Sequence, residues 1–300
     1  MNILMTGANG YLGKETVRFI LENTRHRIIG ISRHWDKDTP QNARFQQLTC
    51  DLLSPLPAGQ INRIDVIIHL AALVKINMDS PREVRELLNH NTAMMLNVLN
   101  WAKDRHVKRF IFASSMTVYK NAPPKGRLSG QTPLEPPHFY GLSKLWAEQM
   151  LHLFCRSKKI HGGLVVRFPG LFGGSRHGGM LYNSVQNFKA NKDFKLDLKN
   201  LGNWDVLHVR DAAQMLVDLL DKCPLKGNFT VLNAGYGDRM DLNDLLKQMR
   251  TYYHSTSKVT ILNEQDHCPC SMGIGRLRKL LGSWSFSRKK GLGRLLEEMY

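Results

Sequence analysis

The feature that most constrains the fold is a glycine-rich turn near the first residue, in which Gly7, Gly10 and Gly13 recur at every third position. The apolar stretch 2–5 before the turn predicts a buried strand, and apolar residues over 12–20 recur at helical spacing. A phosphate-binding loop needs this context, because glycines let a phosphate approach the backbone and a helix N-terminus offers unpaired N–H groups. The alternative is a glycine-rich strand-to-helix turn that binds nothing. We expect these residues to contact a dinucleotide: Gly7, Gly10, Tyr11, Leu12 and Gly13.

Composition places the chain among ordinary soluble proteins, since 42% of its 300 residues are hydrophobic and 22% are charged. This length allows one large domain or two small ones. The sequence shows neither a signal peptide nor a membrane-spanning run, and five scattered cysteines favour reduced thiols, so we expect a cytoplasmic protein. The net charge of +17 is compatible with nucleic-acid binding, with an acidic substrate or with a solvated basic surface.

The second predicted strand, 27–32, ends at the position that usually selects the coenzyme. In a dinucleotide fold, an acidic residue about 20 positions after the glycines binds the adenosine ribose 2′-hydroxyl. Here that position holds Ser32, followed by Arg33. A carboxylate would repel a 2′-phosphate, whereas Ser32 and Arg33 can accept one, so the sequence favours NADP over NAD. An arginine exposed in a turn is the alternative.

We expect the carboxyl ends of two more strands to border the coenzyme. The strand over 45–50 leads to Asp51, which either binds the adenine amino group or closes a turn. The apolar strand over 65–70 is of the buried parallel type, with His69 packed in the sheet, and the small residues after it would let a coenzyme lie against the strand end. We expect these residues to border the coenzyme: Asp51, Leu52, Leu70, Ala71 and Ala72.

An apolar stripe over 81–104 predicts one helix or two, because Asn91 interrupts it. We expect Asn91 to order the neighbouring backbone and count it with the coenzyme-binding residues. The segment 120–138 is rich in proline and glycine and reads as a loop over the sheet edge.

A serine, a tyrosine and a lysine carry the candidate chemistry. The predicted strand 108–113 runs into Ser115 at the carboxyl edge of the sheet, where open α/β sheets bind ligands. Tyr140 and Lys144 stand four residues apart at the start of a predicted helix, so they share one face. An ammonium near a phenol favours the phenolate, so we expect Lys144 to lower the pKa of Tyr140 and to make it a general acid–base for an alcohol or carbonyl held by Ser115. The alternative is a surface pair.

Together these motifs resemble the extended short-chain dehydrogenase/reductases, the NAD(P)-dependent epimerase/dehydratase family of nucleotide-sugar enzymes. The resemblance covers nearly the whole chain, and several motifs in the same order are far more specific than any one of them. The matching segments are 6–13, 69–72, Asn91 with 97–99, 114–119, Tyr140 with Lys144, 167–173, 208–213, 233–235, and 277–282 with 291–292.

The resemblance implies a Rossmann-type α/β fold, a doubly wound parallel sheet with a smaller C-terminal substrate-binding lobe. We expect the NAD(P)-binding domain over 1–168 plus 204–235 and the lobe over 169–203 plus 236–300. The family also pairs helices such as those at 81–104 and 139–156 into a homodimer.

The resemblance also implies residue roles. Tyr140 would be the acid–base, Lys144 would lower its pKa and hold the nicotinamide ribose, and Ser115 would polarise the substrate carbonyl. The following residues would close over the nicotinamide: Phe168, Pro169, Gly170 and Leu171.

Two departures from the family pattern bear on the substrate. Dehydratases of the family carry an acidic pair just after the catalytic hydroxyl, where this chain has Met116 and Thr117, so dehydration is not expected. Many members carry an arginine for the nucleotide phosphates where this chain has Trp204. Arg176, Lys189, Lys192 or a C-terminal arginine could serve instead. We take Thr117, Arg176 and Trp204 as candidate substrate contacts.

The remaining clusters are weaker. In 267–270 the thiols are too closely spaced for a zinc site and have no second pair, so no metal is expected. The basic, leucine-containing segment 276–294 reads first as packed amphipathic helices and only second as a surface for nucleic acid or membrane.

The sequence therefore predicts an NADP- or NAD-dependent epimerase or ketoreductase that acts on a nucleotide-activated sugar, with no nucleic-acid or membrane partner. Two alternatives remain: a reductase of a non-nucleotide carbonyl, and a dinucleotide-sensing regulator without turnover.

Overall fold

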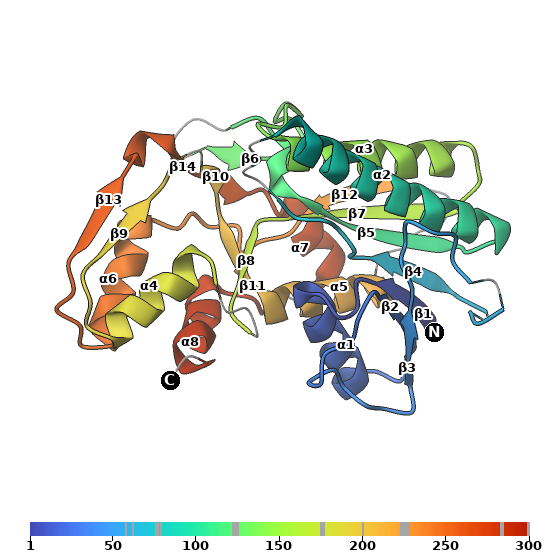
Figure 1. Ribbon diagram of the computed structural model, residues 1–300, viewed down its shortest axis with the longest axis horizontal. Helices are drawn as coiled ribbons and strands as arrows, with labels where there is room; N and C mark the ends of the chain where they lie inside the picture. Colours follow the sequence, from blue (N-terminus) through green and yellow to red (C-terminus); the bar gives the residue numbers. More distant parts are fainter. Residues whose placement is uncertain are drawn as a thin grey trace.

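The computed structural model describes residues 1–57, 59–61, 63–75, 78, 80–121, 126–174, 178–199, 201–222, 229–282 and 285–298. A seven-stranded parallel sheet forms its centre, built from β1 (Asn2–Thr6), β2 (Arg27–Ser32), β3 (Phe45–Thr49), β4 (Val66–His69), β5 (Arg109–Ser115), β7 (Gly162–Phe168) and β12 (Phe229–Asn233). The strand order is β12-β7-β5-β4-β1-β2-β3 (Figure 1). The predicted doubly wound parallel sheet is confirmed.

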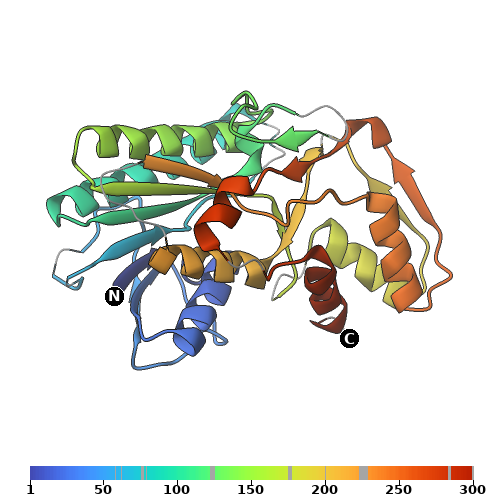
Figure 2. The same cartoon turned by 180° about the vertical axis from the view of Figure 1, so that it is seen from behind.

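Helices cover both faces of this sheet. On one face lie α2 (Pro81–Asp104) and α3 (Phe139–Arg156), and on the other lie α1 (Tyr11–Asn23) and α5 (Val209–Lys222), as Figures 1 and 2 show. The alternation of side chains along a strand explains this arrangement. In β1, Ile3 and Met5 pack into the core with α1 and α5, whereas Leu4 packs into the core with α2 and α3.

The two central strands are joined by side chains as well as by the backbone. The fully buried His69, at the end of β4, has its Nδ1 2.7 Å from the Thr6 hydroxyl at the end of β1. Its ring also stacks on Phe112 of β5, with centroids 5.8 Å apart. His69 is therefore a structural residue of the sheet, as the sequence predicted.

The segment 81–104 forms one helix, not two. Ser80 and Glu83 make a capping box at its start and Pro81 occupies the first turn, which are strong helix-start signals. Asn91 does not interrupt α2, because its side chain reaches outward and bonds both the N–H and the C=O of Leu73, at 2.8 and 3.0 Å. It therefore orders the neighbouring loop.

A smaller lobe packs beyond the carboxyl ends of the strands, around its own apolar core. It holds α4 (Met180–Lys189), α6 (Leu242–Tyr252) and α8 (Arg288–Glu298), and the strand pairs β9 (Phe194–Asp197) with β13 (Val259–Leu262) and β10 (Gly202–Trp204) with β14 (His267–Pro269). Short elements connect it to the sheet: β6 (Arg127–Leu128) with β15 (Ser271–Met272), β8 (Gly170–Phe172) with β11 (Val206–His208), α7 (Gly275–Leu281), and the 3₁₀ turns Met116–Val118 and Glu264–Asp266. The predicted loop 120–138 thus contains one short strand.

Basic residues near the end of the chain bond inside the protein. Arg288 is buried and donates to Asp205 at 2.9 Å, and Arg278 donates to the carbonyl of Tyr236 at 3.2 Å. Arg294 pairs with Asp211. This part of the positive charge is structural, which agrees with the packed-helix interpretation of 276–294. In the portion of the chain that the structure describes, no helix is long and apolar enough to cross a bilayer.

Candidate active site

The glycine turn between β1 and α1 is built so tightly that side chains would not fit. Gly7 has φ +71°, and a Cβ there would lie 2.7 Å from the backbone nitrogen of Ala71. A Cβ at Gly13 would lie 2.1 Å from the carbonyl oxygen of Gly7. The turn therefore packs directly on the end of β4, and Gly13 lies behind the turn, where it shapes the turn without facing a ligand.

A cleft of about 1000 Å³ opens in front of this turn, between the carboxyl ends of the strands and the smaller lobe. Its position at the reversal of strand order between β1 and β4 is where open α/β sheets bind ligands. Asn91 and Gly13 do not line it, and Arg176 lies outside the described residues. The predicted residues that do line it are Gly7, Gly10, Tyr11, Leu12, Ser32, Arg33, Asp51, Leu52, Leu70, Ala71, Ala72, Ser115, Thr117, Tyr140, Lys144, Phe168, Pro169, Gly170, Leu171 and Trp204.

The turn has the donors that a dinucleotide pyrophosphate needs. Gly10 is the N-cap of α1 and has no side chain to cap the N–H groups of the first turn, and Tyr11 and Leu12 of that turn line the cleft. Asn9 is buried, lines the cleft, and its Nδ2 has no hydrogen-bond partner among the residues that the structure describes. A buried donor without a partner is destabilising unless a ligand satisfies it. The residues present therefore fit a dinucleotide coenzyme.

The loop after β2 is tied to the same turn. The Lys14 ammonium contacts Asp36 at 2.6 Å and Asp38 at 2.8 Å, and the Asn9 Oδ1 accepts from the Thr39 hydroxyl at 2.9 Å. Burial acts to lower the pKa of Lys14, but the hydrogen bonds that it donates to the two carboxylates raise the pKa overall. These contacts fix the segment that carries Arg33, which is exposed at the end of the cleft.

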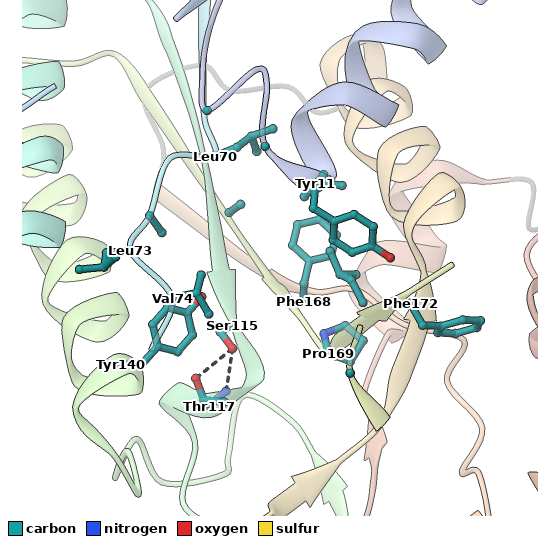
Figure 3. Close-up of a pocket in the computed structure, with 18 of the residues that line it drawn as sticks. Tyr11, Leu70, Leu73, Val74, Ser115, Thr117, Tyr140, Phe168, Pro169 and Phe172 are labelled. Atoms are coloured by element: carbon teal, nitrogen blue, oxygen red, sulfur yellow. Dashed lines mark hydrogen bonds between the residues drawn. The ribbon is translucent and has the colours of Figure 1, made fainter. Parts of the chain in front are cut away.

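Ser115 is prepared to donate a hydrogen bond into the cleft. Its Oγ accepts from the Thr117 backbone N–H at 3.2 Å and from the Thr117 hydroxyl at 2.9 Å (Figure 3). With its oxygen accepting two bonds, the Ser115 hydroxyl hydrogen is left for a third partner. Tyr140 and Ser115 line the same cleft (Figure 3), although the two residues come from α3 and β5.

Lys144 lies beneath Tyr140 and is almost fully buried. Its ammonium donates to the Ala113 carbonyl at 2.8 Å and lies 5.8 Å from the centre of the Tyr140 ring. Burial lowers the pKa of Lys144 to about 8, and the nearby Glu148 carboxylate opposes that shift. The ammonium is therefore close to titrating at neutral pH.

The predicted direction of the Tyr140 pKa is wrong for this structure. Burial raises the pKa of Tyr140 above its ordinary value. The ammonium of Lys144 bonds to a carbonyl and is not hydrogen-bonded to the phenol, so it does not offset the loss of solvation. In this state Tyr140 is a neutral phenol and a proton donor.

A buried polar network supports the floor of the cleft. Arg167 forms a bidentate pair with Glu148, with contacts at 2.9 and 2.6 Å, and Ser114 donates to the same carboxylate at 2.5 Å. The Arg167 guanidinium also lies 4.7 Å above the centre of the Tyr119 ring. The network joins α3, β5 and β7, so it holds α3, which carries Lys144, in register with β5, which carries Ser115.

The wall that belongs to the smaller lobe is mostly apolar. Its side chains come from α4, from β10 with the residues that flank it, from β11 and from α8. Trp204 packs edge-on against His267 at 5.3 Å between ring centres. Lys199 is exposed and lines the cleft, whereas the proposed cations Lys189 and Lys192 do not line it. The residues of this wall are Met180, Leu181, Tyr182, Gln186, Lys199, Leu201, Asn203, Trp204, Asp205, Val206, Leu295 and Glu298.

Several cleft residues had no sequence signal. Lys199, Tyr182 and Gln186 stand in segments without a motif. Glu298 on α8 contacts Gly174, His208 and Arg210, all far from it in the sequence. The cysteine segment 267–270 forms β14 and the turn after it, with the Cys270 thiol directed at the carbonyl of Trp204.

The comparison that decides the family is a match of the NAD dependent epimerase/dehydratase family model to residues 3–235. The chain belongs to this family. An uncharacterized UDP-glucose epimerase of Bacillus subtilis, YtcB, is 25% identical over 251 residues, which is 80% of this chain and 78% of that protein. A decarboxylating sterol-4-alpha-carboxylate 3-dehydrogenase of Dictyostelium discoideum is 25% identical over 241 residues, 71% of this chain and 72% of that protein.

The same epimerase/dehydratase fold is found in solved structures. A UDP-glucuronic acid 4-epimerase from Bacillus cereus, in complex with UDP-glucuronic acid and NAD, superposes with a TM-score of 0.83 and 22% identity, over 100% of both chains. The predicted resemblance to the extended short-chain dehydrogenase/reductases is confirmed.

Proposed function

We propose that this family member is an NAD(P)-dependent epimerase or ketoreductase that acts at a carbinol or keto carbon of a nucleotide-activated sugar. The observation that carries the proposal is that Ser115, Tyr140 and Lys144 line the same cleft as the glycine turn. UDP-sugar names among the relatives and the solved structures support the substrate class.

Each residue has a defined part in this mechanism. A bound coenzyme would supply hydride transfer at its nicotinamide, and the positive charge of its oxidised form would favour a phenolate at Tyr140. Tyr140 passes the proton to or from the substrate oxygen, and Ser115 donates its hydrogen to that oxygen and orients it. Lys144, as an ammonium held by Ala113, stabilises negative charge on Tyr140 and contacts the nicotinamide ribose. Asn9 and the first turn of α1 hold the pyrophosphate.

We propose that water elimination is not part of the reaction. Dehydration needs an acid and a base near the carbons that lose water. The Met116 side chain is buried, and the Thr117 hydroxyl is bonded to Ser115, so neither supplies a titratable group.

We propose NADP as the preferred coenzyme, on the basis of Ser32 and Arg33 at the adenosine end of the cleft. The UDP-glucuronic acid 4-epimerase structure from Bacillus cereus holds NAD, so a preference for NADP would distinguish this chain from it.

We also propose a homodimer through α2 and α3. Phe139, Trp146 and Leu153 repeat every seven residues along α3 and are 45%, 41% and 54% exposed, and Leu96 on α2 is 43% exposed. Exposed apolar stripes of this kind mark protein interfaces.

A second candidate is the reduction of a non-nucleotide carbonyl. The wall of the cleft that belongs to the smaller lobe, here called the substrate wall, favours this candidate. Lys199 is the one Lys or Arg side chain from that lobe among the described lining residues, whereas a pyrophosphate ordinarily binds several cations. A relative named as a sterol dehydrogenase agrees with an apolar substrate.

The test is a thermal-shift series with NAD, NADP and UDP-sugars, followed by analysis of products, because a ligand that binds only the native state raises the melting temperature. Stabilisation by a dinucleotide and a UDP-sugar, with product formed, supports the first candidate. Binding of UDP-sugars without any product would instead favour the dinucleotide-sensing regulator, and dinucleotide binding with no response to UDP-sugars favours the second candidate.

A further inference from the structure

A strap of five residues, 170–174, crosses the cleft in front of the glycine turn. It consists of β8 and the two glycines that follow it, and all five residues line the cleft. The Tyr11 hydroxyl donates to the Gly173 carbonyl at 2.6 Å. In Figure 3, Tyr11 extends from the glycine turn toward the strand that ends at Phe172. This bond joins the two walls beside the phosphate-binding turn.

The other side of the strap is held by the last turn of α8. The Gly174 N–H donates to the Glu298 carboxylate at 2.6 Å, and the same oxygen lies 3.2 Å from His208 Nε2. His208 Nδ1 accepts from the Arg210 N–H at 3.2 Å, so the ring hydrogen is on Nε2 and is donated to Glu298. The Arg210 guanidinium lies 3.2 Å from the other Glu298 oxygen.

Glu298 is therefore a fixed, charged anchor. Burial acts to raise its pKa, but the hydrogen bonds from His208 and from the Gly174 N–H, with the charge of Arg210, hold that pKa below its ordinary value. Within the described residues, Glu15 is a second carboxylate at this place, and it pairs with Arg18 at 2.7 Å and Arg210 at 3.6 Å.

The backbone of the strap can follow this path only because its last two residues, Gly173 and Gly174, are glycines. Gly173 and Gly174 have φ +83° and +60°. A Cβ on Gly173 would lie 2.2 Å from His208 Nε2, and one on Gly174 would lie 2.9 Å from a Val209 methyl. The strap is thus pressed against the start of α5 and bonded to Tyr11 and Glu298 on its two sides.

We propose that Tyr11 and Glu298 are positioning residues that clamp the strap over the pyrophosphate part of the bound coenzyme and slow its release. This inference rests on the proposed function and makes it more specific. With coenzyme retained, the substrate carbon loses a hydride and its hydroxyl loses a proton to Tyr140, and both return to the same substrate molecule. No net oxidation occurs, so the clamp favours epimerisation over net reduction.

The experiment measures the dissociation rate of the reduced coenzyme from the full chain, as the loss of bound fluorescence after an excess of oxidised coenzyme is added. Tyr11→Phe removes one hydroxyl, and Glu298→Gln removes the charge but keeps the shape. Each variant is expected to release the coenzyme about tenfold faster, which corresponds to about 1.4 kcal/mol. Tyr253→Phe is the matched control, because its hydroxyl bonds the Leu296 carbonyl of α8 at 3.1 Å and does not line the cleft.

The outcomes separate the clamp from the proposed function. Faster coenzyme release in Tyr11→Phe and not in Tyr253→Phe supports the clamp. If Glu298→Gln lowers the melting temperature of the free protein, the result with Tyr11→Phe alone decides between clamp and no clamp. Release within twofold of the parent in both Tyr11→Phe and Glu298→Gln, with UDP-sugar epimerisation intact, overturns the clamp alone. A parent protein that binds neither NAD nor NADP overturns both proposals.

Discussion

The two walls of the cleft differ in how they are built. The carboxyl ends of the sheet strands form one wall, here called the coenzyme wall, and its polar groups are held by several hydrogen bonds each. Ser115 accepts two, and Glu148 accepts three behind Lys144. The substrate wall consists largely of apolar side chains around Trp204, with Lys199 at its rim.

This difference indicates that the coenzyme wall carries the chemistry and that the substrate wall determines substrate selectivity. A hydride and a proton must be transferred in one geometry, so the groups that do it need fixed partners on rigid elements. Recognition of the rest of a substrate tolerates variation, and apolar surface there changes affinity more than it changes geometry. Substitutions on the first wall should therefore change kcat, and substitutions on the second should change KM.

The largest effect is expected for Tyr140→Phe. Loss of the phenol removes the general acid–base and should lower kcat by about 10²- to 10⁴-fold, while coenzyme affinity stays within a few-fold. Steady-state kinetics and a coenzyme titration measure both quantities. Tyr252→Phe, on an exposed tyrosine of α6 away from the cleft, is the control. A Tyr140→Phe variant with normal kcat would show that Tyr140 is not the general acid–base.

Glu148→Ala should have the second largest effect, which is a loss of folding stability. It leaves the buried Arg167 guanidinium without its partner, and breaking such a pair lowers the free energy of unfolding by about 3–5 kcal/mol. Glu135→Ala removes an exposed carboxylate 2.8 Å from Lys120 and is the control, for which we expect little change. Urea denaturation measures the free energy of unfolding of both variants. Equal losses of that free energy would mean that the Glu148–Arg167 network does not stabilise the fold.

The rate should fall as the pH rises through about 8. Lys144 has its pKa lowered to about 8 by burial, so above that value it loses the proton that stabilises charge on Tyr140. Each further pH unit should reduce the rate by up to about tenfold. Because the Glu148 charge raises the pKa of Lys144, Glu148→Gln should move the midpoint to lower pH. A pH–rate profile that is flat from 7 to 10 would contradict this role of the lysine.

Arg33→Ala tests the adenosine end of the coenzyme wall. Loss of the guanidinium should weaken NADP binding by about tenfold, or 1.4 kcal/mol, and leave NAD binding within twofold. Arg27→Ala, on the exposed start of the same strand, is the control. Equal losses for the two coenzymes would show that Arg33 does not contact a 2′-phosphate.

The smallest effect is expected on the substrate wall. Lys199→Ala should raise KM for a UDP-sugar by about two- to fivefold, the size expected for one exposed ion pair, and leave kcat unchanged. Lys192→Ala, an exposed lysine that does not line the cleft, is the control. A KM that does not respond favours the non-nucleotide substrate.

Local patterns predicted the coenzyme wall because each of its features depends on a few adjacent residues. The glycine turn requires residues without a Cβ at Gly7 and Gly13, and the four-residue spacing of Tyr140 and Lys144 places them on one helix face. The parallel strands were also readable, since buried strands of this kind are continuously apolar.

Other properties depend on contacts between distant segments. The pKa direction of Tyr140 depends on how deeply the cleft buries it, and the continuity of α2 through Asn91 depends on a bond to Leu73. Glu298 and Lys199 reach the cleft only through the packing of the smaller lobe, which no local pattern encodes.

The burial of His69 in the sheet makes the central strands sensitive to acid. Burial, together with the charge of Lys144, lowers the pKa of His69 to about 3. Between pH 6.5 and about 3 the unfolded chain takes up a proton at this imidazole, whereas the folded chain does not. Acidification therefore withdraws up to about 1.4 kcal/mol of folding free energy per pH unit from this single side chain.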